Sequence, residues 1–481
     1  MKTRFGPWAS AAFLLFFSAY SAAVSPSYTS AKQDRFIIGA WGKMPLSGPI
    51  GGSTANDLQA LQRMRAAHFN TFATGWCGAS EFNDPSGGAA WPSLHYALNL
   101  IAQIPGLRVM LWDSRYTGTY PGNAGVPGVV QSVKADVSSL SAPDVVMGYC
   151  ITDEPSPGTA LSNALTWIST FNTSDPSRIA WANLLPFLYS PRYNYFPNGW
   201  SDYCGYVRTY LDQSKSSVAG FDYYAFNNGD IWNSYNDPYA SSPTFYFRNL
   251  DLFAAECNSR GMSFWAFPYS GHETDPNLNK APISEENLRF QAFAPLVYGA
   301  KGIVYYTYTL HPGMDMSMVD AAGNNPTVVY TWASDINAQV KSMGPVLMGL
   351  DRIATYHENQ IDNGGYPGQS LETGLATVAP DNAVIGSFSS TFKSFVLGHF
   401  IHGTTPYLLV FNKDRFSSRD VTITLKKAVP VWQMNKATGT WNRLYASTTT
   451  VNLTNVGKSD IQLLRLANLD TSPIINLLLN D

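Results

Sequence analysis

Two adjacent carboxylic acids, Asp153 and Glu154, stand just beyond the apolar run 145–151. Pro155 follows them, ends the run as a strand and restricts the backbone of Glu154. A carboxyl group held in a partly apolar opening can have a raised pKa, as a general acid requires. A Glu-Pro pair is also common in surface loops, but its place beyond an apolar run favours a catalytic role for Glu154.

Further residues of suitable chemistry lie at or just beyond the ends of other apolar runs. They are Trp41, Trp76, Trp112, Asp113, Asn183, Asp222, Tyr224, Trp265, His272, Glu273 and Tyr306. Aromatic rings can stack on the flat faces of sugar rings, while polar side chains bind sugar hydroxyl groups. Two carboxyl groups that flank a glycosidic bond can hydrolyse it. The set predicts a carbohydrate site with Glu154 and Glu273 as catalytic residues and the others, with Asp153, as substrate contacts.

These residues can meet only if the runs that carry them lie side by side. Eight short apolar runs alternate with helical patterns, at residues 36–41, 70–76, 107–113, 145–151, 179–184, 218–224, 263–268 and 302–308. Such alternation predicts βα units with a parallel sheet. Eight units favour a closed (β/α)8 barrel, and no G-x-G-x-x-G turn supports a dinucleotide fold. The active site of such a barrel lies at the C-terminal ends of its strands, where the candidate residues stand.

The pattern changes after Leu350. Alternating apolar and polar residues predict strands at 394–400, 407–411, 421–425, 429–434 and 461–466. We therefore expect a catalytic barrel at 24–350 and an antiparallel β-sandwich at 351–481. The second domain could bind carbohydrate, but a domain that covers the barrel is the favoured interpretation.

The N-terminus has the pattern of a signal peptide. Lys2 and Arg4 precede an apolar run at 9–20, and small residues at 21–23 suit a cleavage site after Ala23. We therefore expect residues 1–23 to be removed from a secreted, extracellular or periplasmic protein. No other segment is long and apolar enough to span a membrane. The net charge of −3 gives no sign of a nucleic-acid-binding surface. We expect a monomer whose partner is its carbohydrate substrate.

Three motifs resemble clan A retaining glycoside hydrolases, in particular β-galactosidase-like families. Gly148-Tyr-Cys-Ile-Thr-Asp-Glu-Pro155 is similar to their fourth strand, which the acid/base Glu follows. Ala294-Pro-Leu-Val-Tyr-Gly-Ala-Lys-Gly-Ile-Val-Tyr-Tyr-Thr-Tyr308, preceded by Glu286-Asn-Leu-Arg289, resembles helix seven and strand eight. Phe221-Asp-Tyr-Tyr224 is similar to the end of strand six, where a Tyr often supports the nucleophile. The resemblance covers residues 36–310. It implies a (β/α)8 barrel that cleaves a β-linked oligo- or polysaccharide with retention, through a glycosyl-enzyme intermediate.

The sequence departs from that pattern at two points. Asp153 stands where the clan usually has Asn, which places a second charge beside Glu154. The seventh run ends in Trp265-Ala-Phe-Pro268, without the expected nucleophilic Glu. Glu273 is the nearest candidate, and His272 could orient it or a substrate hydroxyl.

Other assignments of the second carboxyl remain open. Asp222 or Asp113 could serve in an inverting hydrolase or a lyase, whereas Glu286 fits the first turn of a helix after Ser284. A barrel that binds sugar without cleaving it is a third possibility. A separation of about 5–5.5 Å between the two carboxyls would indicate retention, and about 6.5–9.5 Å inversion.

The four cysteines match no zinc-binding spacing, and the scattered histidines form no metal motif. We therefore expect no cofactor. Cys204 and Cys257 fall on neighbouring predicted helices, so they are the expected disulfide in an exported chain. Two sequons, at Asn172 and Asn452, would accept glycans only in a eukaryotic secretory host.

Overall fold

The structure is a computed structural model of the chain. The residues it describes are 28–42, 44–46, 54–75, 94–117, 120–187, 195–226, 243–273, 283–311, 313–321, 323–358, 376–379 and 381–467. The predicted signal peptide therefore lies outside the described residues. No described helix is long and apolar enough to cross a membrane.

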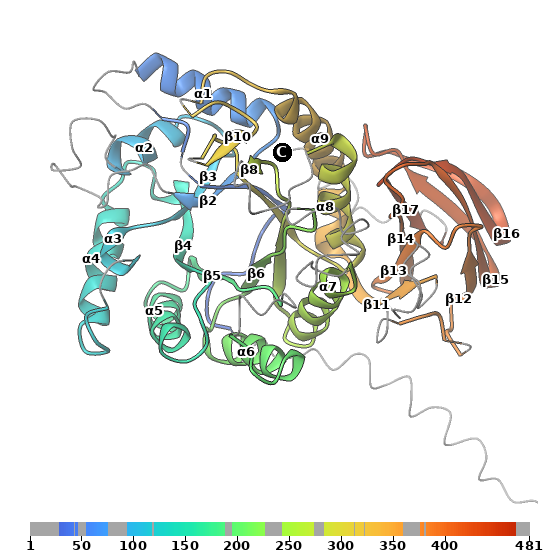
Figure 1. Ribbon diagram of the computed structural model, residues 1–481, viewed down its shortest axis with the longest axis horizontal. Coiled ribbons are helices and arrows are strands. Elements are labelled where there is room, and N and C mark those ends of the chain that lie inside the picture. The colour runs from blue at the N-terminus through green and yellow to red at the C-terminus, as the bar shows by residue number, and fades with distance from the viewer. Residues whose placement is uncertain are drawn as a thin grey trace, which may run out of the picture.

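Eight parallel strands close into a barrel in the order β1-β2-β3-β4-β5-β6-β7-β9 (Figure 1). Their bounds are β1 Ile37–Trp41, β2 Thr71–Gly75, β3 Arg108–Leu111, β4 Val146–Asp153, β5 Ile179–Leu184, β6 Val218–Asp222, β7 Ser263–Phe267 and β9 Gly302–Tyr306. The predicted barrel is confirmed, and each predicted run ends within two residues of its strand. The runs were recognisable because strands of a parallel barrel are buried on both faces and are therefore almost entirely apolar.

Helices surround the barrel (Figure 1). They are α1 Thr54–Ala66, α2 Leu94–Ile101, α3 Ser114–Thr117, α4 Val126–Ser138, α5 Thr159–Ser174, α6 Trp200–Gln213, α7 Pro243–Asn258, α8 Glu285–Val297 and α9 Val328–Gly349, with the short 3₁₀ helix η1 Pro143–Val145. Their apolar faces share one core with the outer side of the barrel wall. The hydroxyl of Ser284 accepts a hydrogen bond from the Asn287 amide at 3.2 Å and caps α8. Glu286 therefore lies in the first turn, as predicted, and pairs with Lys458 at 3.5 Å.

A second core fills the inside of the barrel. Trp181 and Trp265 are fully buried there, with ring centroids 4.8 Å apart. Glycines on neighbouring strands make room for them. A Cβ at Gly220 would lie 2.7 Å from the Trp181 ring, and one at Gly302 would lie 2.6 Å from the Trp265 ring.

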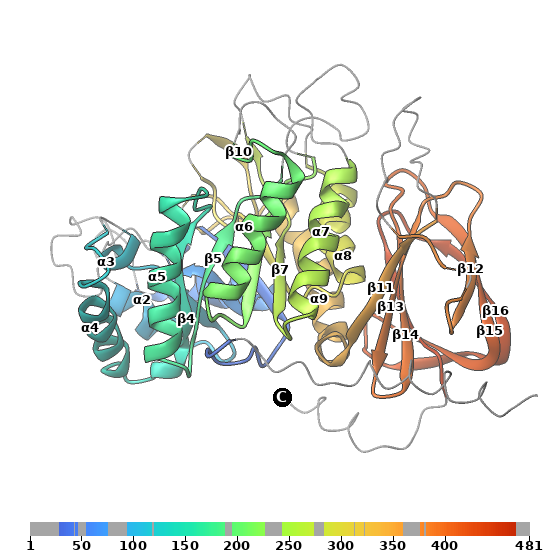
Figure 2. The same cartoon turned by 90° about the horizontal axis from the view of Figure 1, so that it is seen from below.

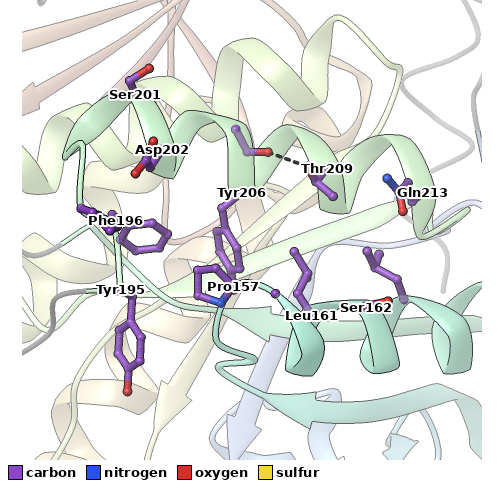
Figure 3. A pocket seen from close by; sticks show the side chains of 14 residues that line it. Pro157, Leu161, Ser162, Tyr195, Phe196, Ser201, Asp202, Tyr206, Thr209 and Gln213 are labelled. Atoms are coloured by element: carbon purple, nitrogen blue, oxygen red, sulfur yellow. Dashed lines mark hydrogen bonds between the residues drawn. The ribbon is translucent and has the colours of Figure 1, made fainter. Parts of the chain in front are cut away.

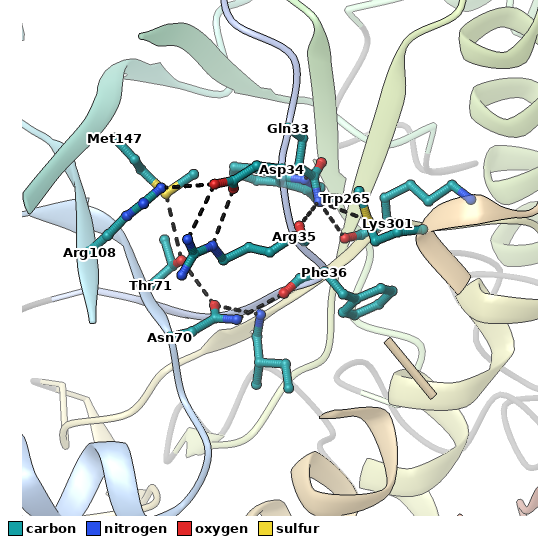
Figure 4. A network of polar contacts seen from close by, with 12 residues as sticks. Gln33, Asp34, Arg35, Phe36, Asn70, Thr71, Arg108, Met147, Trp265 and Lys301 are labelled. Carbon is teal, nitrogen blue, oxygen red and sulfur yellow. Dashed lines mark hydrogen bonds and ion pairs between the residues drawn. The ribbon is translucent and has the colours of Figure 1, made fainter. Parts of the chain in front are cut away.

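Polar contacts close the N-terminal end of the barrel (Figure 4). The indole of Trp265 donates a hydrogen bond to the Gln33 side chain at 2.9 Å. Gln33 in turn donates to the Lys301 carbonyl at 2.7 Å, which ties the segment before β1 to the start of β9. Asn70 donates to the Phe36 carbonyl at 2.8 Å in the same way. These contacts fix one end of the barrel and leave the C-terminal ends of the strands for the site.

The C-terminal part of the chain forms the predicted antiparallel β domain. Its strands are β11 Asp351–His357, β12 Ile385–Ser389, β13 Phe395–His402, β14 Thr405–Asn412, β15 Arg419–Met434, β16 Trp441–Val456 and β17 Ile461–Arg465. They form one sheet in the order β11-β13-β14-β17-β15-β12, with β16 paired to β15. The sheet folds back on itself around its own core, so that β12, β15 and β16 face β11, β13 and β14 (Figure 2).

Two details of this domain differ from the prediction. The segments at 421–425 and 429–434 belong to one long strand, β15, whose pairing with β16 shifts register between them. The strands β11, β12 and β16 were not predicted. In β16 most side chains are polar and solvent-exposed, so the apolar alternation that marks a half-buried strand is weak.

The β domain packs against helix α8. The rings of Phe290 on α8 and Phe411 on β14 lie 5.3 Å apart. Beside them, Asp460 pairs with Arg289 of α8 at 2.7 Å and with Lys436 of its own domain at 2.5 Å. An apolar contact and an ion-pair network therefore hold the two domains together.

The predicted disulfide is not formed: Cys204 and Cys257 are free thiols, as is Cys150. Cys257 is buried in the main core and Cys204 packs against that core, so the two side chains contribute to apolar packing. Asn172 is also fully buried and donates hydrogen bonds to two backbone carbonyls, those of Ala180 and Ser214. The folded chain therefore cannot carry a glycan at Asn172.

Candidate functional site

Four polar side chains meet where β4, β5 and β6 end. Asp153 is the last residue of β4 and Glu154 follows it, Asn183 lies near the end of β5, and Asp222 is the last residue of β6. The Asn183 side chain donates a hydrogen bond to Asp153 at 2.9 Å, and its interaction with Asp222 lowers the pKa of that carboxyl in part. The carboxyls of Glu154 and Asp222 interact, since each changes the pKa of the other. The barrel thus gathers three carboxyl groups and one amide, all predicted as site residues, into one polar cluster.

The backbone of Glu154 is held in an unusual conformation. Its φ is +46°, in the left-handed region that residues other than Gly seldom adopt. The Glu154 amide donates to the Asn183 carbonyl at 2.9 Å. The Tyr206 hydroxyl of α6 donates to the Pro155 carbonyl at 2.9 Å and accepts from the Leu185 amide at 3.3 Å. Strained backbone that surrounding contacts hold in place is a feature of functional sites.

The three carboxyls differ in their contact with solvent. Asp222 is 8% exposed, whereas Asp153 and Glu154 are exposed at the open end of the barrel. Burial, and then the charge of Glu154, raises the pKa of Asp222 well above its usual value. Displacement of water by the surrounding protein, and then the charge of Asp222, raises the pKa of Asp153 to about 7. The same displacement, and then the charge of Asp153, raises the pKa of Glu154.

Burial affects the pKa values of Glu154 and Asp222 to different extents. Because Asp222 is buried and Glu154 faces solvent, the pKa of Asp222 is raised further, while the interaction with Asp222 lowers the pKa of Glu154 in part. A ligand that covers Glu154 removes its water and so favours the protonated form of Glu154. The cluster can therefore hold and transfer a proton at near-neutral pH, as acid–base chemistry requires.

Aromatic rings border the cluster on two sides. Tyr224, just beyond β6, stacks on Tyr306 of β9 at 5.5 Å, and Tyr269 lies 5.0 Å from Tyr224. Trp41 of β1 lies 6.3 Å from Trp112 and 5.3 Å from Phe267. The charges of Asp153, Asp222 and Glu154 act on Tyr306, whose pKa is raised first by burial and then by these charges. The predicted residues Trp41, Trp112, Tyr224 and Tyr306 therefore lie with the carboxyls at the C-terminal end of the barrel.

Two predicted residues are not part of this cluster. The Asp113 carboxyl is fully buried and pairs with Arg115 at 2.6 Å, and Arg115 also pairs with Asp136 at 2.6 Å. Trp265 points towards the opposite end of the barrel, where it binds Gln33 (Figure 4). Trp265 is the third residue of β7, so it lies one layer below Phe267, the last residue of that strand.

The predicted second carboxyl, Glu273, lies on a short strand beyond β7. Strand β8 (His272–Glu273) pairs with β10 (Met314–Met316), with Glu273 opposite Met314. The neighbouring His272 binds Asp315 through Nδ1 at 2.7 Å. The Glu273 side chain lies outside the described part of the structure, as does all of Trp76.

Sequence reasoning missed three residues that shape this region. Phe267 and Trp181 are each two residues away from a predicted site residue on the same strand, so strand alternation could have identified them. Tyr206 sits in the middle of helix α6. Its role depends on which helix face meets the loop after β4, and no local sequence pattern signals that.

A groove of about 540 Å³ lies on the outside of the barrel between α5 and α6 (Figure 3). It is lined by residues such as Pro157, Leu161, Tyr195 and Thr209, and Tyr206 connects it to the loop that holds Glu154. Among the residues that the structure describes, no group of three or more His, Cys, Asp or Glu side chains is placed to hold a metal ion.

Comparison with models of known protein families finds no match, and neither does comparison with curated proteins. Solved structures do match over most of the chain. Two are of a GH42 β-galactosidase from G. stearothermophilus, one of them a catalytic mutant. They have TM-scores of 0.53 and 0.52, 10% identity, and coverage of 92% of this chain and 100% of theirs. A noncanonic maltogenic α-amylase from Thermotoga neapolitana matches with a TM-score of 0.50 and 10% identity, over 90% of this chain and 99% of its own. At this identity the similarity shows a shared fold.

Proposed function

We propose that this protein is a secreted glycoside hydrolase that cleaves a β-linked oligo- or polysaccharide with retention, and that Glu154 is its acid/base residue. The observation that carries the proposal is the fixed position of Glu154 at the end of β4, where its amide binds the Asn183 carbonyl and its pKa is raised. Aromatic rings beside it suit a sugar ring. The shared fold with a GH42 β-galactosidase supports the same class of reaction.

In the proposed reaction Glu154 protonates the leaving oxygen while the bond from the anomeric carbon to that oxygen breaks. A carboxylate on the opposite face of the sugar forms a covalent bond to the anomeric carbon. Water then attacks this carbon and gives its proton to Glu154, and the carboxylate leaves. Atoms and charges balance over the two steps, and Glu154 returns to its protonated form.

We propose Glu273 as the second carboxyl. Asp113 is already paired with Arg115, and Asp222 is buried. Asp222 is only 8% exposed, so it presents little surface to a sugar, whereas a nucleophilic carboxylate must reach the anomeric carbon. We assign Asp222 and Asp153 to the control of the Glu154 proton, with Asn183 as the residue that orients both.

One observation favours a second candidate, a barrel that binds saccharide without cleaving it. Strand β7 ends in Phe267, and no residue of this strand is a carboxylic acid. An inverting hydrolase or lyase that uses Asp222 or Asp113 is less well supported, because both carboxyl groups are buried.

The proposal is tested by incubating the full mature chain with a panel of aryl β-glycosides and β-linked polysaccharides. We expect release of a reducing sugar whose first-formed anomer, observed by NMR, keeps the β configuration. An α anomer would indicate inversion, and binding without any product would favour the second candidate. N-terminal sequencing and gel filtration of the exported protein test the expected start at Val24 and the expected monomer.

A further inference from the structure

The end of the β domain that lies beside the barrel opening displays two phenylalanine rings to solvent. Phe416 is 67% exposed and Phe392 is 54% exposed. They lie in the turns before β15 and before β13, respectively. We call the two rings, with Arg415 and Arg419, the aromatic platform. Neither ring contributes to the apolar cores of the described structure, so folding does not explain their presence.

Buried and partly buried carboxylates hold both turns in place. The Glu358 side chain is 0% exposed and accepts hydrogen bonds from the Ser390 hydroxyl at 2.7 Å and the Phe395 amide at 3.1 Å, on either side of Phe392. Asp414 accepts from the Phe416 amide at 2.8 Å and pairs with Arg419 at 2.7 Å. The rings therefore stand on rigid turns, and a ligand would not have to order them.

Each ring is covered by a guanidinium group. The Arg419 guanidinium carbon lies 3.6 Å from the centroid of Phe392, and that of Arg415 lies 4.8 Å from the centroid of Phe416. A cation over one face fixes the ring orientation and leaves the other face for a flat apolar ligand. Because Arg419 also binds Asp414, the two halves of the platform are linked.

The platform adjoins the wall of the proposed active site. Arg415 binds Asn287 at the start of α8 at 2.5 Å and lies 4.6 Å from the ring of Phe226. Phe226 follows β6 only four residues after Asp222, in the connection that also carries Tyr224. The contacts thus run from the carboxyl cluster along the end of β6 to the β domain.

From this continuity we propose that the aromatic platform binds a distal part of the substrate, so that the substrate is a saccharide chain that reaches from the barrel opening onto the β domain. This inference rests on the proposed function and narrows its substrate to a polymer or long oligomer. Two rings offer a small apolar surface, which suits stacked sugar units better than a protein partner, since a specific protein interface buries about 800 Å² on each side.

The test measures binding and turnover in the full chain with Phe392→Ala, Phe416→Ala and the double variant. Binding is measured in the Glu154→Gln background by affinity electrophoresis in gels that contain a soluble β-linked polysaccharide. We expect each single substitution to raise the dissociation constant roughly two- to tenfold, the contribution of one aromatic contact. In the double variant the dissociation constant should rise by the product of the two factors. In the Phe variants that keep Glu154, KM for the polymer should rise by a similar factor, while kcat/KM for an aryl glycoside should stay constant.

Leu444→Ala is the matched control, because Leu444 is an exposed apolar residue of the same domain. It lies near the start of β16, whereas the end of β16 at Val456 pairs with Arg419 of the platform. Phe416→Tyr should retain binding. Unchanged binding in the double variant would overturn the inference, as would a native chain that binds no polysaccharide in the panel. A change of oligomeric state in the double variant would assign the rings to a protein interface instead. Binding that depends on the rings without any hydrolysis would preserve the platform and reject the proposed hydrolase.

Discussion

At the scale of single residues, burial separates three carboxyl groups that share one small site. Asp222 is buried and its pKa is raised well above the usual value, whereas Glu154 and Asp153 face the opening. Groups of the same chemical type thereby acquire different proton affinities, which is how one site can hold both an acid and its modulators. Asn183 couples two of them, because its amide donates a hydrogen bond to Asp153 and lowers the pKa of Asp222 in part.

Glu154→Gln keeps the size and hydrogen-bonding capacity of the side chain but removes the transferable proton. We expect kcat on unactivated saccharides to fall by about 10²–10⁴, the usual contribution of general acid–base catalysis. Substrates with a very acidic leaving group should lose less in the first step, because that group departs without protonation. The variant should remain folded, with a cooperative thermal unfolding transition like that of the native chain. Glu286→Gln, a helix-start residue paired with Lys458, is the control and should keep full activity. Full activity of Glu154→Gln on natural saccharide would exclude the proposed mechanism.

Asp153→Asn places an amide where clan A enzymes usually have one, and it removes a charge that raises the pKa of Glu154. Glu154 should then lose its proton at a lower pH. We expect the basic limb of the kcat/KM profile to shift to lower pH, because the general acid must be protonated in the free enzyme. The measurement is kcat/KM between pH 4 and 9. A basic limb that stays in place would show that Asp153 does not act on Glu154.

Asp153→Asn should also change how stability depends on pH. A carboxyl whose pKa is raised on folding, here to about 7, stabilises the fold below its unfolded pKa and loses that contribution as pH rises through 7. The variant should therefore unfold at a higher temperature than the native chain at pH 8, by about 2 °C. This corresponds to roughly 1 kcal/mol after allowance for solvent screening of an exposed group. The two should be equal at pH 4, and calorimetry at both pH values checks this.

At the scale of helices and strands, the barrel was predictable because its strands carry an unbroken apolar pattern. The run 179–184 coincides with β5, and the other seven deviate by one or two residues. The position of a side chain within a strand was harder to predict. Trp265 and Phe267 lie on the same face of β7, yet only Phe267 is near the opening, and the sequence does not reveal how deep a strand sits in the barrel.

The candidate site could be predicted where residues lie at or just beyond the C-terminal ends of strands, as Glu154, Asp153, Asn183 and Asp222 do. It could not be predicted where a role depends on contacts between elements. Asp113 also follows an apolar run, but the nearby Arg115 and the helix residue Asp136 turn it into a structural ion pair. The bridge expected between Cys204 and Cys257 failed for a similar reason, since adjacent helices need not point their thiols at each other.

Tyr206→Phe tests the link between helix α6 and the loop that carries Glu154. The hydroxyl it removes bonds to the Pro155 carbonyl and the Leu185 amide, and both groups are left unsatisfied. We expect a loss of about 1–3 kcal/mol in unfolding free energy and about a tenfold loss in kcat, because Glu154 is less well positioned. Tyr210→Phe, one turn further along α6, removes a hydroxyl bonded to the Ala182 amide inside the barrel wall. This control should lose stability but not kcat, and equal losses of kcat would contradict a positioning role for Tyr206.

At the scale of the whole molecule, the β domain is attached to the barrel through α8, the helix that follows the β7 end of the site, and through α7, whose Asp251 pairs with Arg352 of β11 at 2.5 Å. Helix α8 also contacts the site, since Gln291 accepts a hydrogen bond from the Tyr269 amide at 3.2 Å. Its outer face binds the β domain through Arg289 and Phe290. The β domain thereby supports one side of the barrel opening and places the aromatic platform beside it.

Asp460 is the anion of the network that joins the domains. Burial would raise the pKa of Asp460, but the charges of Lys436 and Arg289 outweigh it, and the net effect is a pKa below the usual value. Burial lowers the pKa of Lys436, and its attraction to Asp460 opposes this shift only in part. Removing the anion would therefore leave two cations close together in a poorly solvated junction, which is the costly way to break a buried ion pair.

We expect Asp460→Asn to lower the free energy of unfolding at pH 7 by about 2–3 kcal/mol. This is less than the 3–5 kcal/mol of a fully buried pair, because water still reaches each partner in part. A carboxyl with a lowered folded pKa contributes stability above its unfolded pKa and loses it as pH falls through the folded value. The difference in unfolding free energy between native and variant chains should thus have its full value at pH 6–7. It should shrink below about pH 4, where the carboxyl of the native chain becomes protonated.

Asp34→Asn, which breaks exposed ion pairs with Arg35 and Arg108, is the control and should lower the free energy of unfolding by at most about 1 kcal/mol. Guanidinium denaturation at several pH values measures all three chains. A loss for Asp460→Asn that stays constant down to pH 3 would show that the junction does not depend on the charge of this carboxyl.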